Sequence, residues 1–159
     1  MCSSDLSGVI AVEKASGRIV WHAGADLVAQ QHTPIMMEGG TVLVFDNGNL
    51  RMGSSNPFSR ALEFDPATMQ VTWSYTDPNA PSFFSPFMGS AERLPNGNTL
   101  ICESAFGRLF EVTPAGETVW EFVIPDFAEY PAPVNQFIKG SHNGCFRAHR
   151  YSAEQVTWL

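Results

Sequence analysis

A hairpin pattern that ends in tryptophan recurs along this 159-residue chain and constrains its fold more than any other feature. Each copy has a short alternating apolar segment, a polar turn and a second segment that reaches Trp, which is the pattern of a β-hairpin. The four copies are Val9–Trp21, Ala61–Trp73, Leu109–Trp120 and Phe146–Trp158. Repeats at this spacing indicate units that stack on their neighbours, so the sequence predicts an all-β repeat protein.

A second hairpin pattern precedes two of these copies, at residues 32–48 and 89–104. Each complete unit is therefore expected to hold four antiparallel strands, which is the composition of a propeller blade. The sequence predicts an all-β β-propeller fragment with two complete four-stranded blades, at about 31–77 and 86–125, and a half blade at each end. Residues 125–144 carry scattered Pro and aromatic residues and are predicted to form an irregular insertion.

The two ends of the sequence suggest a piece of a longer protein. We interpret residues 1–6 as a non-native start and residues 7–159 as one partial propeller domain. No export signal is visible at the start, and no apolar run approaches the roughly 18 residues that a membrane-spanning helix needs. The net charge of −7, with no basic run, argues against binding to nucleic acid or an anionic membrane.

Several short motifs make the chain similar to a known family. They are QHTP (31–34), VFDNG (44–48), FSPF (84–87), RLPNGNTLICE (93–103) and FRAHRY (146–151). Over about residues 30–159 the chain resembles the bacterial arylsulfotransferases. The resemblance implies a six-bladed propeller located in the periplasm or outside the cell. It also implies transfer of a sulfuryl group from a phenolic sulfate ester to a phenol through a transiently sulfated histidine, without cofactor.

The resemblance also suggests the site residues. His32 and Arg51 correspond to the family's His and Arg that flank the FDNG turn, and His149 is the third predicted catalytic residue. A neutral imidazole can attack sulfur or accept a phenol proton, and a guanidinium can bind the sulfate oxygens. Asn47 and Arg147 are predicted to bind substrate. Blade geometry brings the two-to-three loop, which contains Asn47, to the same face as the start of strand one, and Arg147, near the start of a third strand, should approach that face.

Four of these residues, His32, Arg51, His149 and Arg147, have an alternative interpretation without a functional role. His32 would bond a neighbouring backbone carbonyl, Arg51 would be a solvated loop residue, and Arg147 would pair with an acidic residue. His149 aligns with apolar residues in the other repeats, so it is either a core histidine bonded to a neighbouring blade or a residue that faces the channel. His142 is expected to be solvated in its loop.

Two cysteines of the domain, Cys102 and Cys145, form no metal-ligand spacing, and no metal site is predicted. They are expected to be buried free thiols, with a disulfide as the alternative. The function predicted is aryl-sulfate sulfotransfer on small phenolic molecules, with this fragment inactive alone and its oligomeric state open. The alternative function is a non-catalytic propeller that binds a ligand or a protein partner.

Overall fold

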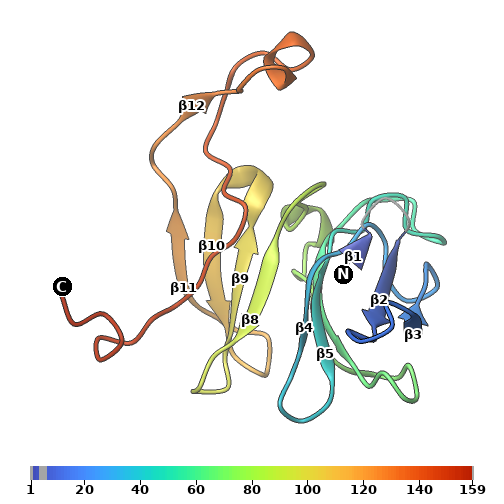
Figure 1. Cartoon of the computed structure of the whole chain (residues 1–159). Coiled ribbons are helices and arrows are strands. Elements are labelled where there is room, and N and C mark those ends of the chain that lie inside the picture. Colours follow the sequence, from blue (N-terminus) through green and yellow to red (C-terminus); the bar gives the residue numbers. More distant parts are fainter. Residues whose placement is uncertain (1, 4–6, 159) are drawn as a thin grey trace.

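The computed structural model describes residues 2–3 and 7–158, and it shows an all-β chain whose strands form four antiparallel sheets (Figure 1). Apart from Cys2–Ser3, the start that we interpret as non-native lies outside the described residues. The first sheet contains β1 (Cys2–Ser3), β2 (Gly8–Val12) and β3 (Ile19–Ala23). No α-helix occurs in the described ranges, and three short 3₁₀ turns lie at Ala80–Ser82, Ser104–Phe106 and Val134–Gln136.

Two four-stranded sheets form the body of the molecule. The first has the order β4 (His32–Met36), β5 (Val42–Asp46), β6 (Arg60–Phe64) and β7 (Val71–Tyr75). The second has the order β8 (Ser90–Arg93), β9 (Thr99–Glu103), β10 (Arg108–Val112) and β11 (Thr118–Val123). Both lie within the segments for which the sequence predicts four-stranded units, and each is a simple meander.

The repeated hairpins share one irregularity as well as their strands. Trp21, Trp73 and Trp120 stand opposite Ala11, Glu63 and Glu111, and the register shifts by a residue directly after each of these partners. Such a β-bulge strengthens the local twist of the strand pair. The three hairpins therefore have the same twisted shape, which lets successive sheets pack in the same way.

The hydrophobic core lies between sheets and divides into two clusters, one on each face of the β4–β7 sheet. The cluster against the N-terminal sheet includes Val42, Val44 and Leu62, and the cluster against the β8–β11 sheet includes Leu43 and Phe45. Along β5, Val42 and Val44 alternate with Leu43 and Phe45 because successive side chains of a strand point to opposite faces. All of β5 is buried for this reason, which makes the β4–β7 sheet the central layer of a three-sheet stack.

The structure corrects the prediction of a strand pair at Phe146–Trp158. This segment contains no strand in the described part of the chain, and Phe146 and Trp158 are exposed. A lone two-stranded hairpin is marginally stable, and within the described ranges no strand pairs with this segment to extend it into a sheet. Residues 145–150 instead lie across the β8–β11 sheet, where Cys145, Ala148 and Arg150 bond to Ser104, Ser90 and Glu111.

The loops that could carry a site gather at one end of the stacked sheets. β4 and β8 begin at this end, whereas β5, β9 and β11 end there, because neighbouring strands alternate in direction. The excursion after β11, which contains β12 (Ala128–Glu129) and β13 (Ser141–His142), rises from the same end (Figure 1). None of the described helices has the length and hydropathy that crossing a bilayer requires.

Candidate functional site

His32 begins strand β4 at a distortion of the backbone. It pairs with Phe45, and the register then shifts before Ile35. Between them Thr33 has a φ of 48°, a left-handed conformation that a β-branched residue rarely adopts. The Thr33 hydroxyl donates to the Gly89 carbonyl at 2.8 Å, which holds the distortion against the loop before β8. Bulges of this kind reorient a side chain at a strand end, and strained backbone concentrates at functional sites.

The Asn47 side chain determines the tautomer of His32. Asn47 is fully buried, and its amide nitrogen donates to the carbonyls of Ser85 (2.8 Å) and Met88 (2.6 Å). Its Oδ1 therefore faces Nδ1 of His32, at 2.8 Å, and an amide oxygen can only accept. Neutral His32 thus carries its proton on Nδ1, which leaves the lone pair of Nε2 available.

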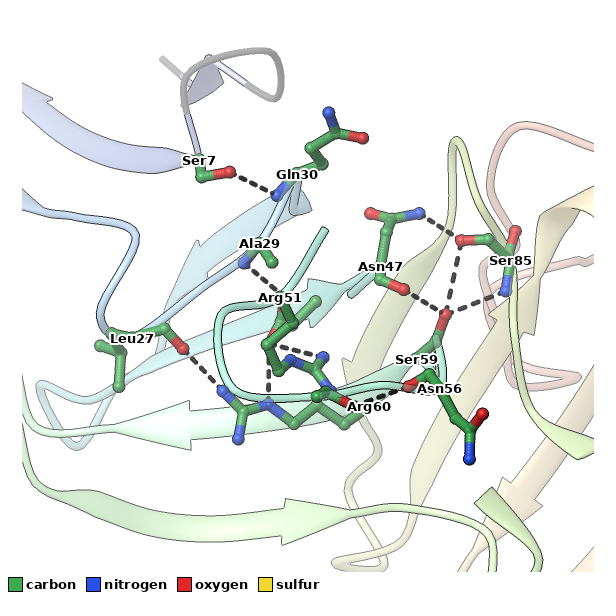
Figure 2. Close-up of polar contacts among 12 residues, drawn as sticks. Ser7, Leu27, Ala29, Gln30, Asn47, Arg51, Asn56, Ser59, Arg60 and Ser85 are labelled. Carbon is green, nitrogen blue, oxygen red and sulfur yellow. Dashed lines mark hydrogen bonds and ion pairs between the residues drawn. The ribbon is translucent and has the colours of Figure 1, made fainter. Parts of the chain in front are cut away.

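The neighbouring residue, Asp46, holds two arginines on the other side of the strand end. Its carboxylate is fully buried and accepts from Nη2 of Arg51 at 3.1 Å and from Nε of Arg60 at 2.7 Å. It also accepts the backbone N–H of Ala29 at 2.7 Å. In Figure 2, Arg60 reaches Leu27 on one side, whereas Asn47 and Ser59 meet Ser85 on the other.

Arg51 is enclosed by its own loop. Its guanidinium lies 4.1 Å from the centre of the Phe58 ring. Gly48, with a φ of 82°, allows the loop to close tightly, because a Cβ at this position would clash with the Phe58 carbonyl oxygen. Burial lowers the pKa of Arg51 below its ordinary value, although the Asp46 charge opposes this. Nε and Nη1 are buried without a hydrogen-bond partner among the residues described, and Arg51 lines a cavity of about 480 Å³.

His32 and Arg51 are thus held by adjacent residues, Asn47 and Asp46, that face different sheets. No hydrogen bond or ion pair joins His32 to Arg51 in the described structure. Asn47 lies beside His32, but its polar atoms are all used within the protein. The FDNG turn therefore positions both predicted residues without bringing them into contact.

The predicted residues of the C-terminal segment lie elsewhere. His149 is half-exposed, and its Nδ1 lies 3.0 Å from Oε2 of Glu92 on β8. Its expected place at the core-facing position of a strand is wrong, because residues 146–158 form no strand. Arg147 is exposed, and Arg150 pairs with Glu111. No contact in the described ranges links His149, Arg147 or Arg150 to His32.

His142 is a residue whose surroundings the sequence did not reveal. The sequence predicts a solvated loop residue, but the His142 ring stacks on Tyr130 at 4.5 Å between centroids and lines an apolar cavity of about 420 Å³. The pairing of Ala128 with His142, in the short β12–β13 ladder, sets this contact. The sequence signal for this contact is limited to the presence of Tyr130 and His142 in the same irregular insertion.

The comparisons with known proteins agree with the motifs. The family model described as arylsulfotransferase (ASST) matches residues 22–130, which is more than half of the chain. The chain therefore belongs to the arylsulfotransferase family.

Among solved structures, one similar chain is a Bacteroides caccae protein described as of unknown function. It shares 19% sequence identity, with a TM-score of 0.49, over 74% of this chain. The chain spans 39% of the length of that protein. A search of the curated proteins found no match.

Proposed function

We propose that the chain is part of an aryl-sulfate sulfotransferase in which His32 carries the sulfuryl group between two phenols. In this proposal the stacked sheets are blades of a propeller that acts in the periplasm or outside the cell. Family membership supports the reaction class. The observation that carries the role of His32 is its hydrogen bond to Asn47, since it orients the imidazole with Nε2 unprotonated.

The first half of the proposed reaction follows from this tautomer. The Nε2 lone pair of His32 attacks sulfur, the N–S bond forms, the S–O bond of the ester breaks, and the donor leaves as a phenolate. The imidazole becomes positively charged while its proton remains on Nδ1. Asn47 Oδ1 accepts that proton's hydrogen bond at 2.8 Å, and this bond strengthens as charge develops on the ring.

In the second half, the oxygen of an acceptor phenol attacks the same sulfur. The new O–S bond forms, the N–S bond breaks, and the electron pair returns to Nε2 of His32. The proton of the acceptor phenol passes to a base such as the departing phenolate or water. Charge and atoms balance over the two steps, and neither nucleotide nor metal is consumed.

Arg51 is the proposed binding group for the sulfate of the donor ester. It presents two unpaired donors beside a cavity, and an unpaired buried donor gains from an anionic partner. His149 and Arg147 remain proposed site residues on the segment that lies across the β8–β11 sheet, where His149 contacts Glu92. Asn47 is proposed to position the His32 ring, and this role replaces the direct contact with substrate that the sequence predicts.

The test uses the complete gene product that contains these residues, with 4-nitrophenyl sulfate as donor and phenol as acceptor. His32→Ala should reduce transfer by about a thousandfold or more, because the nucleophile is lost. His22→Ala is the matched control, since His22 is exposed on β3 and should leave the rate unchanged. Equal rates in wild type and His32→Ala would favour the non-catalytic binding function.

A further inference from the structure

An apolar hollow separates the excursion after β11 from the loop before β8. It has a volume of about 420 Å³ and is lined by Phe87, Met88, Tyr130, Val134, Ile138 and His142, among other residues. The lining side chains are apolar except for the Tyr130 hydroxyl and the His142 ring. A cavity of about 150 Å³ with such a lining already accommodates a benzene ring, so the hollow has room for a substituted ring.

His142 places one hydrogen-bond donor in this apolar wall. Its Nδ1 accepts the backbone N–H of Gly144 at 3.2 Å, so neutral His142 must carry its proton on Nε2. Stacking against Tyr130, at an angle of 24° between the rings, fixes the plane of the imidazole. In its neutral form His142 therefore offers a donor at Nε2, whereas Nε2 of neutral His32 is an acceptor.

The hollow is connected to His32 through two hydrogen bonds. Met88 lines the hollow, and its carbonyl accepts from the Asn47 amide, whose oxygen accepts from His32. The excursion and the start of β4 lie at the same end of the sheets (Figure 1). A ligand in the hollow thus borders the loop that orients the proposed nucleophile.

We propose that this hollow binds the aromatic ring of a phenol or phenolate and that Nε2–H of His142 donates to its oxygen. An aromatic occupant fits flat, apolar walls made of Phe87 and Pro131, which favour stacking and edge contacts. An oxygen acceptor fits because Nε2–H of neutral His142 lines the hollow's wall and donates to no residue in the described ranges, so an oxygen would give it a partner. The role of the bound phenol in sulfuryl transfer rests on the proposed function.

The test measures binding of two probes to the 159-residue chain by titration calorimetry: 4-nitrophenol, at a pH where it is the phenolate, and nitrobenzene, which lacks the oxygen. His142→Ala should weaken 4-nitrophenolate about tenfold and nitrobenzene little, since one charge-assisted hydrogen bond is removed. Val134→Trp should weaken both probes by filling the hollow. Phe137→Trp is the matched control, because Phe137 is 83% exposed on the same excursion and should change neither.

The outcomes separate this site from the sulfotransferase proposal. Absence of saturable 4-nitrophenolate binding to the wild-type chain overturns the site. Unchanged binding to the Val134→Trp variant, with circular dichroism showing that this variant is folded, also overturns it. If binding follows the expected pattern but the complete gene product transfers no sulfate, the site holds and the proposed function fails. If transfer depends on His32 but Val134→Trp alters neither binding nor the KM for phenol, the phenol site is rejected and the proposed sulfotransferase function is kept.

Discussion

The indole Nε1 of Trp73 donates a hydrogen bond of 2.9 Å to the backbone carbonyl of Pro114, which lies in the turn of the next Trp-ended hairpin. Trp21 makes the equivalent bond to the carbonyl of Pro66, at 2.8 Å. Each repeated Trp thus joins its own hairpin to the corresponding turn of the following sheet. Trp120 has no equivalent bond in the described part of the chain and is 46% exposed.

Trp73→Phe should destabilise the chain by about 1 kcal/mol, since it removes the donor to Pro114 but keeps an aromatic ring over the interface. The measurement is the midpoint and slope of urea unfolding, followed by circular dichroism. Trp120→Phe is the matched control and should change the free energy of unfolding by less. Equal losses in the two variants would show that ring size, rather than the bond between sheets, determines the effect.

The sequence predicted the strands of three hairpins because alternation and the terminal Trp are local signals. It could not predict that the bulge after Ala11, Glu63 and Glu111 would recur, since register shifts depend on how paired strands twist. The fourth hairpin carries the same local pattern and is not formed. Pattern alone therefore predicted hairpins correctly only where a neighbouring sheet covers the apolar side.

The candidate site was predictable only in part for a similar reason. His32, Asn47 and Arg51 stand out near the FDNG motif, but the opposed tautomers of His32 and His142 follow from contacts with Asn47 and Gly144. The first contact joins the start of β4 to the residue that follows β5, and the second is made inside an irregular insertion. No periodicity in the sequence encodes either, because hydrogen-bond direction depends on the folded backbone around each ring.

Arg51 and Arg60 share the Asp46 carboxylate but differ in their remaining donors, which gives a second prediction. Arg60 uses Nη2 on the Leu27 carbonyl at 2.6 Å, whereas two nitrogens of Arg51 have no partner in the described ranges. In the complete gene product, Arg51→Lys should raise the KM for 4-nitrophenyl sulfate about tenfold, because Lys cannot reproduce the fork of donors.

Arg60→Lys is the control for this prediction and should lower stability with little change in KM. Unfolding curves for both variants separate folding defects from binding defects. A KM that is unchanged in Arg51→Lys would place Arg51 among the residues that only shape the 47–58 loop.

Two buried glutamates should respond to acid in opposite directions. Burial raises the pKa of Glu111, but hydrogen bonds from Asn98 and Asn96 and the charge of Arg150 outweigh it, so its pKa lies below the ordinary 4.5. Glu111 therefore contributes stability that is present above pH 4.5 and is lost as pH falls through its folded pKa. Burial raises the pKa of Glu103, whose carboxyl therefore gains stability from protonation as pH falls.

Urea unfolding between about pH 7 and about pH 3 tests these signs. Glu111→Gln should make the loss of stability on acidification shallower than in wild type. Glu103→Gln should make it steeper, because the substitution removes a group that favours the folded state when protonated. The same slope in both variants would contradict the opposed environments of the two carboxyl groups.

Cys102 and Cys145 lie with their sulfurs 3.3 Å apart as free thiols, yet they should differ in reactivity. Cys102 is fully buried, and burial, with a smaller effect from Cys145, raises the pKa of its thiol to about 12. Since the thiolate is the nucleophile, Cys102 should react very slowly with iodoacetamide at about pH 8, whereas the partly exposed Cys145 should be alkylated first. Peptide mass spectrometry over time measures both rates, and alkylation in urea is the control that should make them similar. Faster modification of Cys102 in the folded chain would mean that residues 144–150 do not cover β9 as the structure places them.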